Sequence, residues 1–260
     1  MKIYRVLDED GRVAWVAGAD GAFRRLAGDP FGEVAVTDQP VRARRALAPV
    51  DPPNVFAVGL NYRGHAAETG RPAPEAPVVF AKATTSVIGP DEAIVLPAAG
   101  PGCVDYEVEL ALLIGRDARD VPADRAGEFI LGCTVANDVS ARDWQRRLGQ
   151  WVRAKSFDTF CPLGPCIATD LDLADLRLTA TVNGRVMQDS TTSDMIFPPA
   201  ELVAFLSADL TLRAGTVILT GTPAGVGVAR DPQVFLRAGD TVTCAVEGIG
   251  ELTNPVVAAR

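Results

Sequence analysis

The chain has 260 residues, of which 48% are hydrophobic and 22% charged, which is typical of a globular protein with one large domain or a domain with a small appendage. The formal net charge of −8 argues against a nucleic-acid-binding protein, which would present a basic face to the phosphates. It does not exclude an anionic substrate, because a bound metal can invert the local field. Charges precede any apolar run of signal-peptide length, and no stretch approaches the ~20 apolar residues that span a bilayer. We therefore expect a cytoplasmic protein without membrane contact.

The first 53 residues predict a small N-terminal β-rich domain. Residues 3–7 and 13–16 are apolar runs on either side of Asp10-Gly11, a strong hairpin signal. Three prolines between Leu47 and Asn54 mark the end of this domain, so a second domain is expected over 54–260.

Beyond this boundary the sequence predicts a mixed, β-rich α+β fold. Asn183-Gly184 predicts a type I′ hairpin turn. Long connections rich in glycine and proline, with few helical segments, favour mostly antiparallel strands. The expected strands are 55–58, 78–81, 106–114, 130–136, 176–182, 217–220 and 242–246, and the expected helices are about 62–68, 122–128, 140–148 and 198–208.

The five cysteines predict free thiols. An odd number, without a C-x-x-C pair or an export signal, is typical of reduced core cysteines. Cys161 and Cys166 are the closest pair, but a zinc site there would need two more soft ligands at motif spacing, and the sequence has none.

Three acids could hold a divalent metal. In a strand over 106–114, Glu107 and Glu109 lie two residues apart and leave the same side. Two carboxylates this close repel one another unless a cation lies between them. A solvated outer face is the alternative, weakened by apolar residues further along that side. Asp138 follows the next apolar strand, where capping a helix is its alternative role. Carboxylate oxygens suit Mg²⁺ or Mn²⁺, whereas ion pairs from these acids to arginines would count against a metal site.

The single histidine has a carboxylate three residues away. On a short helix His65 and Glu68 share a face, so the carboxylate can orient the imidazole as a base that activates water. A surface pair is the alternative. Lys155, among aromatic residues, is either a buried carboxylate-binding ammonium or a lysine snorkelling at an edge. The Gly-rich loop 220–227 lacks the ending of a P-loop, so we exclude nucleotide binding there.

Taken in order, five stretches resemble the fumarylacetoacetate hydrolase family over roughly residues 54–257. They are GLNYRGHAAE at 59–68, DYEVEL at 105–110, ANDVSARDWQ at 136–145, AKSFDTFCPLGP at 154–165 and LTGTPAGVG at 219–227, with EGIG at 247–250. The chain is most similar to the short bacterial members, because no acid lies between Asn54 and His65, where the eukaryotic fumarylacetoacetase adds a carboxylate ligand.

The resemblance implies a fumarylacetoacetate-hydrolase-like β-roll core in a homodimer. It implies a metal, Mg²⁺ with Mn²⁺ or Ca²⁺ as alternatives, held by Glu107, Glu109 and Asp138. It further implies three catalytic residues: His65 and Glu68, on a segment that closes over the substrate, and Lys155. It implies that Arg142, Gln145 and Thr222 bind the substrate, a small anionic 2-oxo acid.

The implied chemistry is an enolate stabilised by the metal as a Lewis acid. Our first interpretation is a hydrolase that cleaves a C–C bond in a small 2,4-dioxo acid of the acylpyruvate type. The alternatives are 2-hydroxyhepta-2,4-diene-1,7-dioate isomerase, 5-oxopent-3-ene-1,2,5-tricarboxylate or oxaloacetate decarboxylase, and third a 2-keto-3-deoxy sugar acid hydrolase or dehydratase. A non-catalytic metal-binding protein would not require His65, Glu68 and Lys155 beside the three acids.

Overall fold

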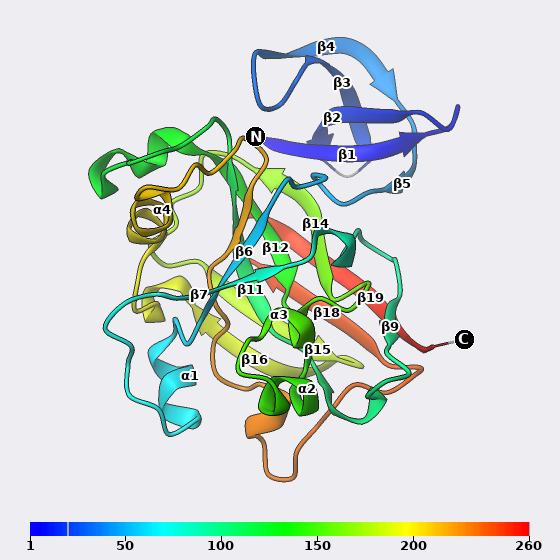
Figure 1. Ribbon diagram of the computed structural model, residues 1–260. Helices are drawn as coiled ribbons and strands as arrows, with labels where there is room; N and C mark the ends of the chain where they lie inside the picture. The colour runs from blue at the N-terminus through cyan, green and yellow to red at the C-terminus, as the bar shows by residue number, and fades with distance from the viewer. Residues whose placement is uncertain (20, 260) are drawn as a thin grey trace.

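The computed structural model describes residues 1–19 and 21–259 (Figure 1). Strands dominate these residues and the α-helices are short, so the predicted mixed, β-rich α+β class is confirmed. The helices are α1 (Arg63–Glu68), α2 (Arg142–Arg147), α3 (Val152–Lys155) and α4 (Pro199–Ser207). None of the helices in this part of the chain is long and apolar enough to cross a membrane.

A large sheet runs from the N-terminal strands through the centre of the molecule. Most neighbours in it are antiparallel, and β17 pairs in parallel with β6. In spatial order its strands are β4 (Val34–Val41), β3 (Ala22–Gly28), β2 (Val13–Ala19), β1 (Lys2–Asp8), β14 (Cys161–Ala168), β12 (Ile130–Asn137), β11 (Val108–Ile114), β17 (Val217–Leu219), β6 (Val55–Gly59) and β7 (Val78–Lys82), with β5 (Ala43–Ala46) paired to β1 and β8 (Val87–Ile88) paired to β14.

The described residues also form two smaller sheets. The five-stranded sheet has the order β16 (Arg185–Thr191), β15 (Arg177–Val182), β18 (Thr241–Val246), β19 (Gly250–Ala258) and β9 (Ile94–Leu96), and the two-stranded sheet pairs β10 (Val104–Asp105) with β13 (Ser140–Ala141). Asn183 and Gly184 both have positive φ, +52° and +77°, which confirms the predicted type I′ turn between β15 and β16.

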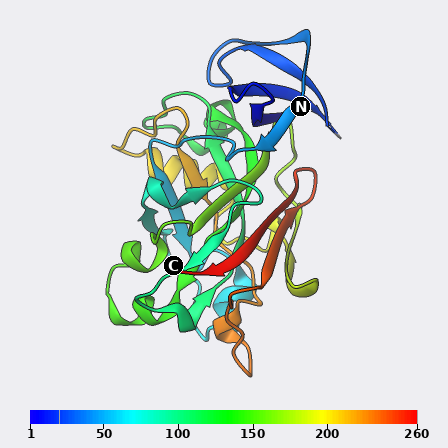
Figure 2. The same ribbon diagram turned by 90° about the vertical axis from the view of Figure 1, so that its right-hand side faces the viewer.

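The N-terminal strands lie at one end of the molecule in both ribbon views (Figures 1 and 2). β1 and β2 form the predicted antiparallel hairpin around Asp10-Gly11. β1 also pairs with β14, with Ile3 opposite Ile167, so the ladder continues from the N-terminal strands into the rest of the sheet.

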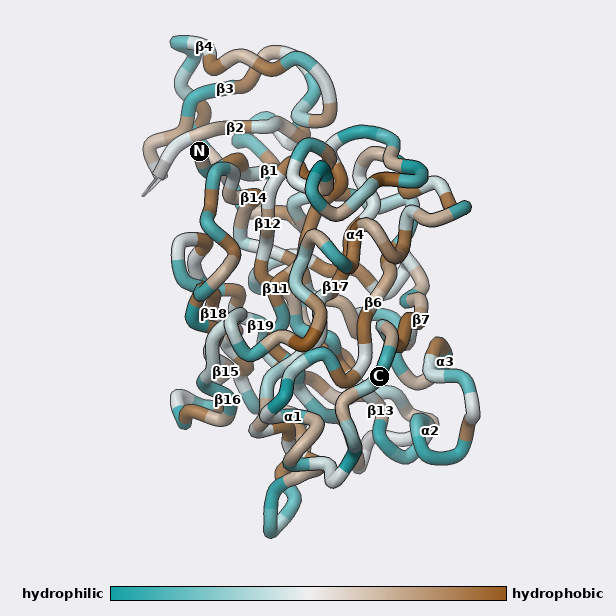
Figure 3. The backbone as a smooth tube through the Cα atoms, turned by 90° about the vertical axis from the view of Figure 1, so that its left-hand side faces the viewer, coloured by the Kyte–Doolittle hydropathy of each residue, from teal (hydrophilic) through white to brown (hydrophobic). Residues whose placement is uncertain are grey.

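The central strand β11 is buried on both sides, and all of its residues except Glu109 are apolar. Leu110 and Leu112 belong to one apolar cluster, whereas Ala111 and Leu113 belong to a second cluster on the opposite side. Glu109 leaves β11 on the same side as Ala111. Hydrophobic backbone segments gather in these central strands, and many peripheral loops are hydrophilic (Figure 3).

Several elements differ from the sequence prediction. The strands β9 and β19 and the helix α3 were not expected, and the helix expected over 140–148 is β13 followed by α2. The strand expected over 106–114 begins only at Val108, because Tyr106 and Glu107 leave the ladder between β10 and β11. The helix expected over 122–128 is a 3-10 helix, Ala123–Phe129. β14 was not predicted, since Pro162 and Pro165 argue against a strand, but its other residues make the ladder contacts with β1 and β12.

Candidate metal centre and active site

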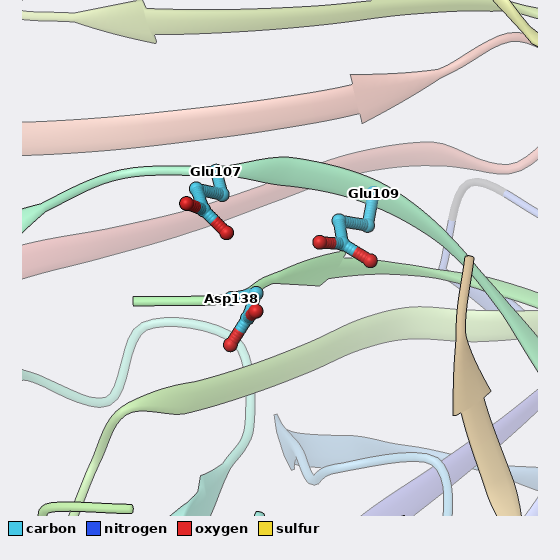
Figure 4. A group of neighbouring side chains, drawn as sticks. All are labelled: Glu107, Glu109 and Asp138. Carbon is cyan, nitrogen blue, oxygen red and sulfur yellow. The ribbon is translucent and has the colours of Figure 1, made fainter. Parts of the chain in front are cut away.

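Three buried carboxylates converge beside the central strands (Figure 4). Glu107 immediately precedes β11 and Glu109 lies within it, while Asp138 follows the last residue of β12. These strands are antiparallel neighbours, and the N–H of Asp138 donates to the carbonyl of Glu107 at 2.9 Å. The ligand oxygens of the three acids all lie within 4.8 Å of one another. The structure therefore brings the three acids together, and their role as metal ligands stays a prediction.

Three buried cations surround these acids. Nζ of Lys155 lies 2.6 Å from Oε2 of Glu107 and 2.5 Å from Oδ2 of Asp138. Nζ of Lys82 lies 2.5 Å from the other oxygen of Asp138. Nη2 of Arg142 lies 2.5 Å from Oε1 of Glu107. We expected metal-ligating acids free of arginine ion pairs, and that expectation is wrong for Glu107.

Glu109 is the acid of this set without a cation within ion-pair distance among the described residues. Its Oε2 accepts one hydrogen bond, from the N–H of Gly221 at 2.6 Å. Burial, and then the carboxylates of Asp138 and Glu107, raise the pKa of Glu109 well above its ordinary value. A buried carboxylate in this position is strongly stabilised by any cation that reaches it.

The charge and chemistry of the cluster fit a divalent metal. Four buried acids, the three above and Asp105, face the three buried cations, which leaves one negative charge when all are ionised. A divalent cation together with one substrate carboxylate would bring the sum to zero. Oxygen-only donor sets are those that Mg²⁺ and Mn²⁺ prefer. The acids that would hold such a metal are Glu107, Glu109 and Asp138.

The ion pairs shift the pKa values of Glu107 and Lys155. Burial alone would raise the pKa of Glu107, but Arg142, Lys155 and His65 outweigh burial and hold that pKa below its ordinary range. Burial acts in the opposite sense on Lys155, where Asp138 and Glu107 outweigh it and raise the pKa. Lys155 is therefore an ammonium ion at neutral pH, and because it is buried it does not snorkel at an edge.

Asp105, which we did not predict as a site residue, joins Arg142 to the Gly-rich loop. Its Oδ2 accepts from Nε of Arg142 at 2.8 Å and from the N–H of Val228 at 3.0 Å, while Oδ1 accepts from the N–H of Gly227 at 2.8 Å. A Cβ on Gly227 would lie 1.8 Å from the carbonyl oxygen of Val234, so this approach requires glycine. The sequence did offer a signal for each missed residue. Asp105 is an acid next to an apolar segment, and Lys82 lies at the end of an apolar strand.

The predicted His65–Glu68 pair is formed. Nδ1 of His65 lies 2.7 Å from Oε1 of Glu68, and Oε2 of Glu68 accepts from the N–H of Gly225 at 2.9 Å. His65 is buried and helix α1 is anchored at its start, where Oδ2 of Asp194 accepts from the N–H of Gly64 at 2.9 Å. The burial of His65 does not fit the alternative of a solvent-exposed surface pair, although Glu68 itself is exposed.

A cavity of about 570 Å³ connects several of the predicted residues. His65 and Glu68 line it from α1, and Arg142 and Gln145 line it from α2. Oε1 of Gln145 accepts from Nη1 of Arg142 at 2.9 Å. Because Arg142 also pairs with Glu107, this cavity adjoins the acidic cluster.

Thr222 is buried behind the acidic strand. Its hydroxyl donates to the carbonyl of Val108 at 2.9 Å and accepts from Nε2 of Gln188 at 2.8 Å. The amide of Gln188 in turn accepts from the N–H of Val108 at 2.9 Å. The hydroxyl of Thr222 thus has two protein partners, and substrate binding by Thr222 stays a prediction.

The sequence matches the family model described as fumarylacetoacetate (FAA) hydrolase, C-terminal, over residues 54–257. The chain belongs to the fumarylacetoacetate hydrolase family. The resemblance inferred from the five motifs is therefore confirmed.

Several similar proteins of this family carry the names of enzymes. Oxaloacetate tautomerase FAHD2A of Homo sapiens is 48% identical, over 81% of this chain and 69% of that protein. The crystal structure of 5-carboxymethyl-2-hydroxymuconate delta-isomerase from Mycobacterium smegmatis is 48% identical over the whole of both chains, with a TM-score of 0.89. That of 2-hydroxyhepta-2,4-diene-1,7-dioate isomerase from Mycobacterium marinum is 45% identical over 99% of this chain and 98% of the other, with a TM-score of 0.87. The chain thus belongs to a family of enzymes that includes tautomerases and isomerases.

Proposed function

We propose that the protein is a metal-assisted tautomerase or isomerase that forms and reprotonates the enol of a small 2-oxo acid. The observation that carries this proposal is the bond between buried His65 and Glu68 on the wall of a cavity that adjoins three convergent carboxylates. The names of the similar enzymes, which describe tautomerisation and isomerisation, support this order of the alternatives.

Each group has a role that follows from its contacts. A divalent cation bound by the three acids, which we take to be Mg²⁺ or Mn²⁺, would stabilise negative charge on the substrate oxygens. Glu68 holds Nδ1 of His65, so Nε2 is the atom that takes a proton from the carbon next to the keto group or returns one to it. Lys155 forms ion pairs with Glu107 and Asp138, and its charge helps to hold the pKa of Glu107 below its ordinary range.

Hydrolysis of an acylpyruvate is the second candidate. The same imidazole, oriented by the same carboxylate, could take its proton from water instead of carbon. Water attack on a distal carbonyl would then give pyruvate and a carboxylic acid. This candidate rests on the same His65–Glu68 pair. It differs only in the group that gives its proton to Nε2, which is water instead of the substrate carbon.

A substrate panel tests the proposal. Oxaloacetate enol, a 2-hydroxydienoate and an acylpyruvate are each followed with Mg²⁺ and with a chelator. We expect metal-dependent conversion of the enol to the keto form and a slower release of pyruvate from the acylpyruvate. Release of pyruvate without any enol–keto conversion would reverse the order of the two candidates, and inactivity on all three would contradict both.

A further inference from the structure

The cavity wall carries positive charge although the whole chain is acidic. The formal net charge is −8, yet three arginines line this cavity, Arg71, Arg142 and Arg146. The one carboxylate among the lining residues, Glu68, is already bound by His65 and the N–H of Gly225. Basic residues thus outnumber acidic ones among the residues that line the cavity, and this balance favours an anionic ligand.

The three arginines differ in their partners. Arg142 is buried and its charge is met by Asp105 and Glu107, so it belongs to the inner end beside the acidic cluster. Arg71 and Arg146 are exposed, and neither has an Asp or Glu within ion-pair distance in the part of the chain that the structure describes. Arg146 makes only a long contact of 4.0 Å, with Sγ of Cys103.

The backbone fixes where both exposed arginines begin. Arg146 follows Arg142 by four residues on α2, so the two side chains leave the same face of the helix. Arg71 closes the turn that ends α1: its N–H donates to the carbonyl of Ala66 at 3.0 Å, and that of Gly70 donates to Ala67 at 3.1 Å. Gly70 has φ of +66°, which completes a Schellman motif at the end of the helix that carries His65.

We propose that Arg71 and Arg146 bind the second carboxylate of a dicarboxylic 2-oxo acid and so select diacids over monoacids. This inference rests on the proposed function, because it assumes that the 2-oxo acid end of the substrate lies at the metal. Both guanidinium groups line the same cavity without an acidic partner among the described residues, and a carboxylate accepts the paired N–H groups of a guanidinium in a matched geometry. Arg71 and Arg146 would act on specificity and not on the reacting atoms.

Calorimetry and kinetics with paired ligands test this assignment. The ligands are oxaloacetate and 2-oxoglutarate, which differ in reach, each beside the methyl ester of its distal carboxyl group. The variants are Arg71→Gln, Arg146→Gln and the double variant. Arg147→Gln is the matched control, since Arg147 is the adjacent exposed arginine of α2 and does not line the cavity. Binding is measured in Mg²⁺, and enol–keto conversion gives KM and kcat.

We expect each single variant to bind at least one diacid roughly tenfold more weakly, as for the loss of a hydrogen bond to a charged group. The affinity for the monoester and kcat should not change, and Arg147→Gln should match the wild type. The proposal is overturned if the wild type binds diacid no more tightly than monoester, or if the variants weaken both alike. If the wild type converts neither ligand, but the two variants lose diacid affinity and keep monoester affinity, the proposed function is refuted and the arginine assignment stands.

Discussion

Glu68 and Gly225, 157 residues apart in the sequence, are joined by a hydrogen bond of 2.9 Å from the Gly225 N–H to Oε2 of Glu68. The other carboxylate oxygen of Glu68 holds Nδ1 of His65. One side chain therefore ties the end of α1 to the Gly-rich loop and orients the imidazole. A Cβ on Gly225 would lie 2.2 Å from the carbonyl oxygen of Met187, so the loop can make this approach only with glycine.

Removing the imidazole should separate catalysis from metal binding. We expect His65→Ala to lower kcat by about 10²- to 10⁴-fold, the usual contribution of a general acid or base. Glu68→Gln should lose less than His65→Ala, because the imidazole is still present, although the single amide oxygen can accept from only one of the Gly225 N–H and Nδ1 of His65. Steady-state kinetics measure both losses, and titration with Mn²⁺ should give the wild-type affinity in each variant. Wild-type turnover by His65→Ala would show that the pair is structural.

Glu109 should be the acid whose charge matters most for the metal. Because this buried carboxylate is not ion-paired and its pKa is raised, Glu109→Gln should fold at least as stably as the wild type without metal. The rise in Tm that saturating Mg²⁺ gives the wild type should be absent in the variant, and activity should be lost. Thermal unfolding with Mg²⁺ and with chelator measures this, with Glu251→Gln, an exposed glutamate, as the control. An equal Mg²⁺-dependent shift in Glu109→Gln would exclude this acid as a ligand.

The sequence predicted most of the strands that carry the site, because their apolar runs are long and their turn residues are specific. It also predicted that Glu107, Glu109 and Asp138 lie together, although the strand expected to carry Glu107 begins one residue after it. What it could not predict are contacts between distant segments. Asp105 is bonded to residues 122 and 123 positions away, and Lys82 reaches Asp138 across 56 residues, so no local pattern marks either one.

β14 shows a second limit. Proline is disfavoured in a central strand, because it has no N–H for the ladder, so Cys161–Ala168 carries a loop signal. The fold tolerates both prolines, since β12 and β1 pair with Leu163, Gly164, Ile167 and Ala168. Pairing with neighbouring strands therefore outweighs the local loop propensity of this segment. Only knowledge of those strands could have led us to predict a strand here.

The thiols should show graded reactivity. All five cysteines are free, as predicted, and four of them are buried. Burial raises the pKa of Cys133 and of Cys161 to about 12, and it also raises the pKa of Cys166 and Cys244, so these thiols are protonated at pH 8. We expect a thiol reagent at pH 8 to label Cys103 alone in the native protein and all five after unfolding. Mass spectrometry of the labelled peptides checks this, and rapid native labelling of Cys133 would contradict it.

Lys82 should stabilise the metal-free protein more than the metal-bound one. Its ammonium group is buried and lies 2.5 Å from Asp138, so Lys82→Met leaves the acidic cluster with one more uncompensated charge. Breaking a buried ion pair from one side costs about 3 to 5 kcal/mol, and we expect that loss in the free energy of unfolding with chelator present. Part of the loss should return in Mg²⁺, because the metal supplies the missing positive charge to the same carboxylate.

The comparison that decides is the Mg²⁺-dependent gain in unfolding free energy, measured by urea denaturation in the wild type, Lys82→Met and Lys2→Met. Lys2 is half-buried and has no carboxylate within ion-pair distance among the described residues, so its variant should match the wild type in both conditions. A larger gain in Lys82→Met than in the wild type places the metal next to Asp138. An equal gain in both would mean that the cation binds too far from this carboxylate to replace the ammonium, and Asp138 would then be removed from the ligand set. Combining Lys82→Met with Glu109→Gln separates the two acids, since the gain should vanish in the double variant only if Glu109 is needed for the metal to bind at all.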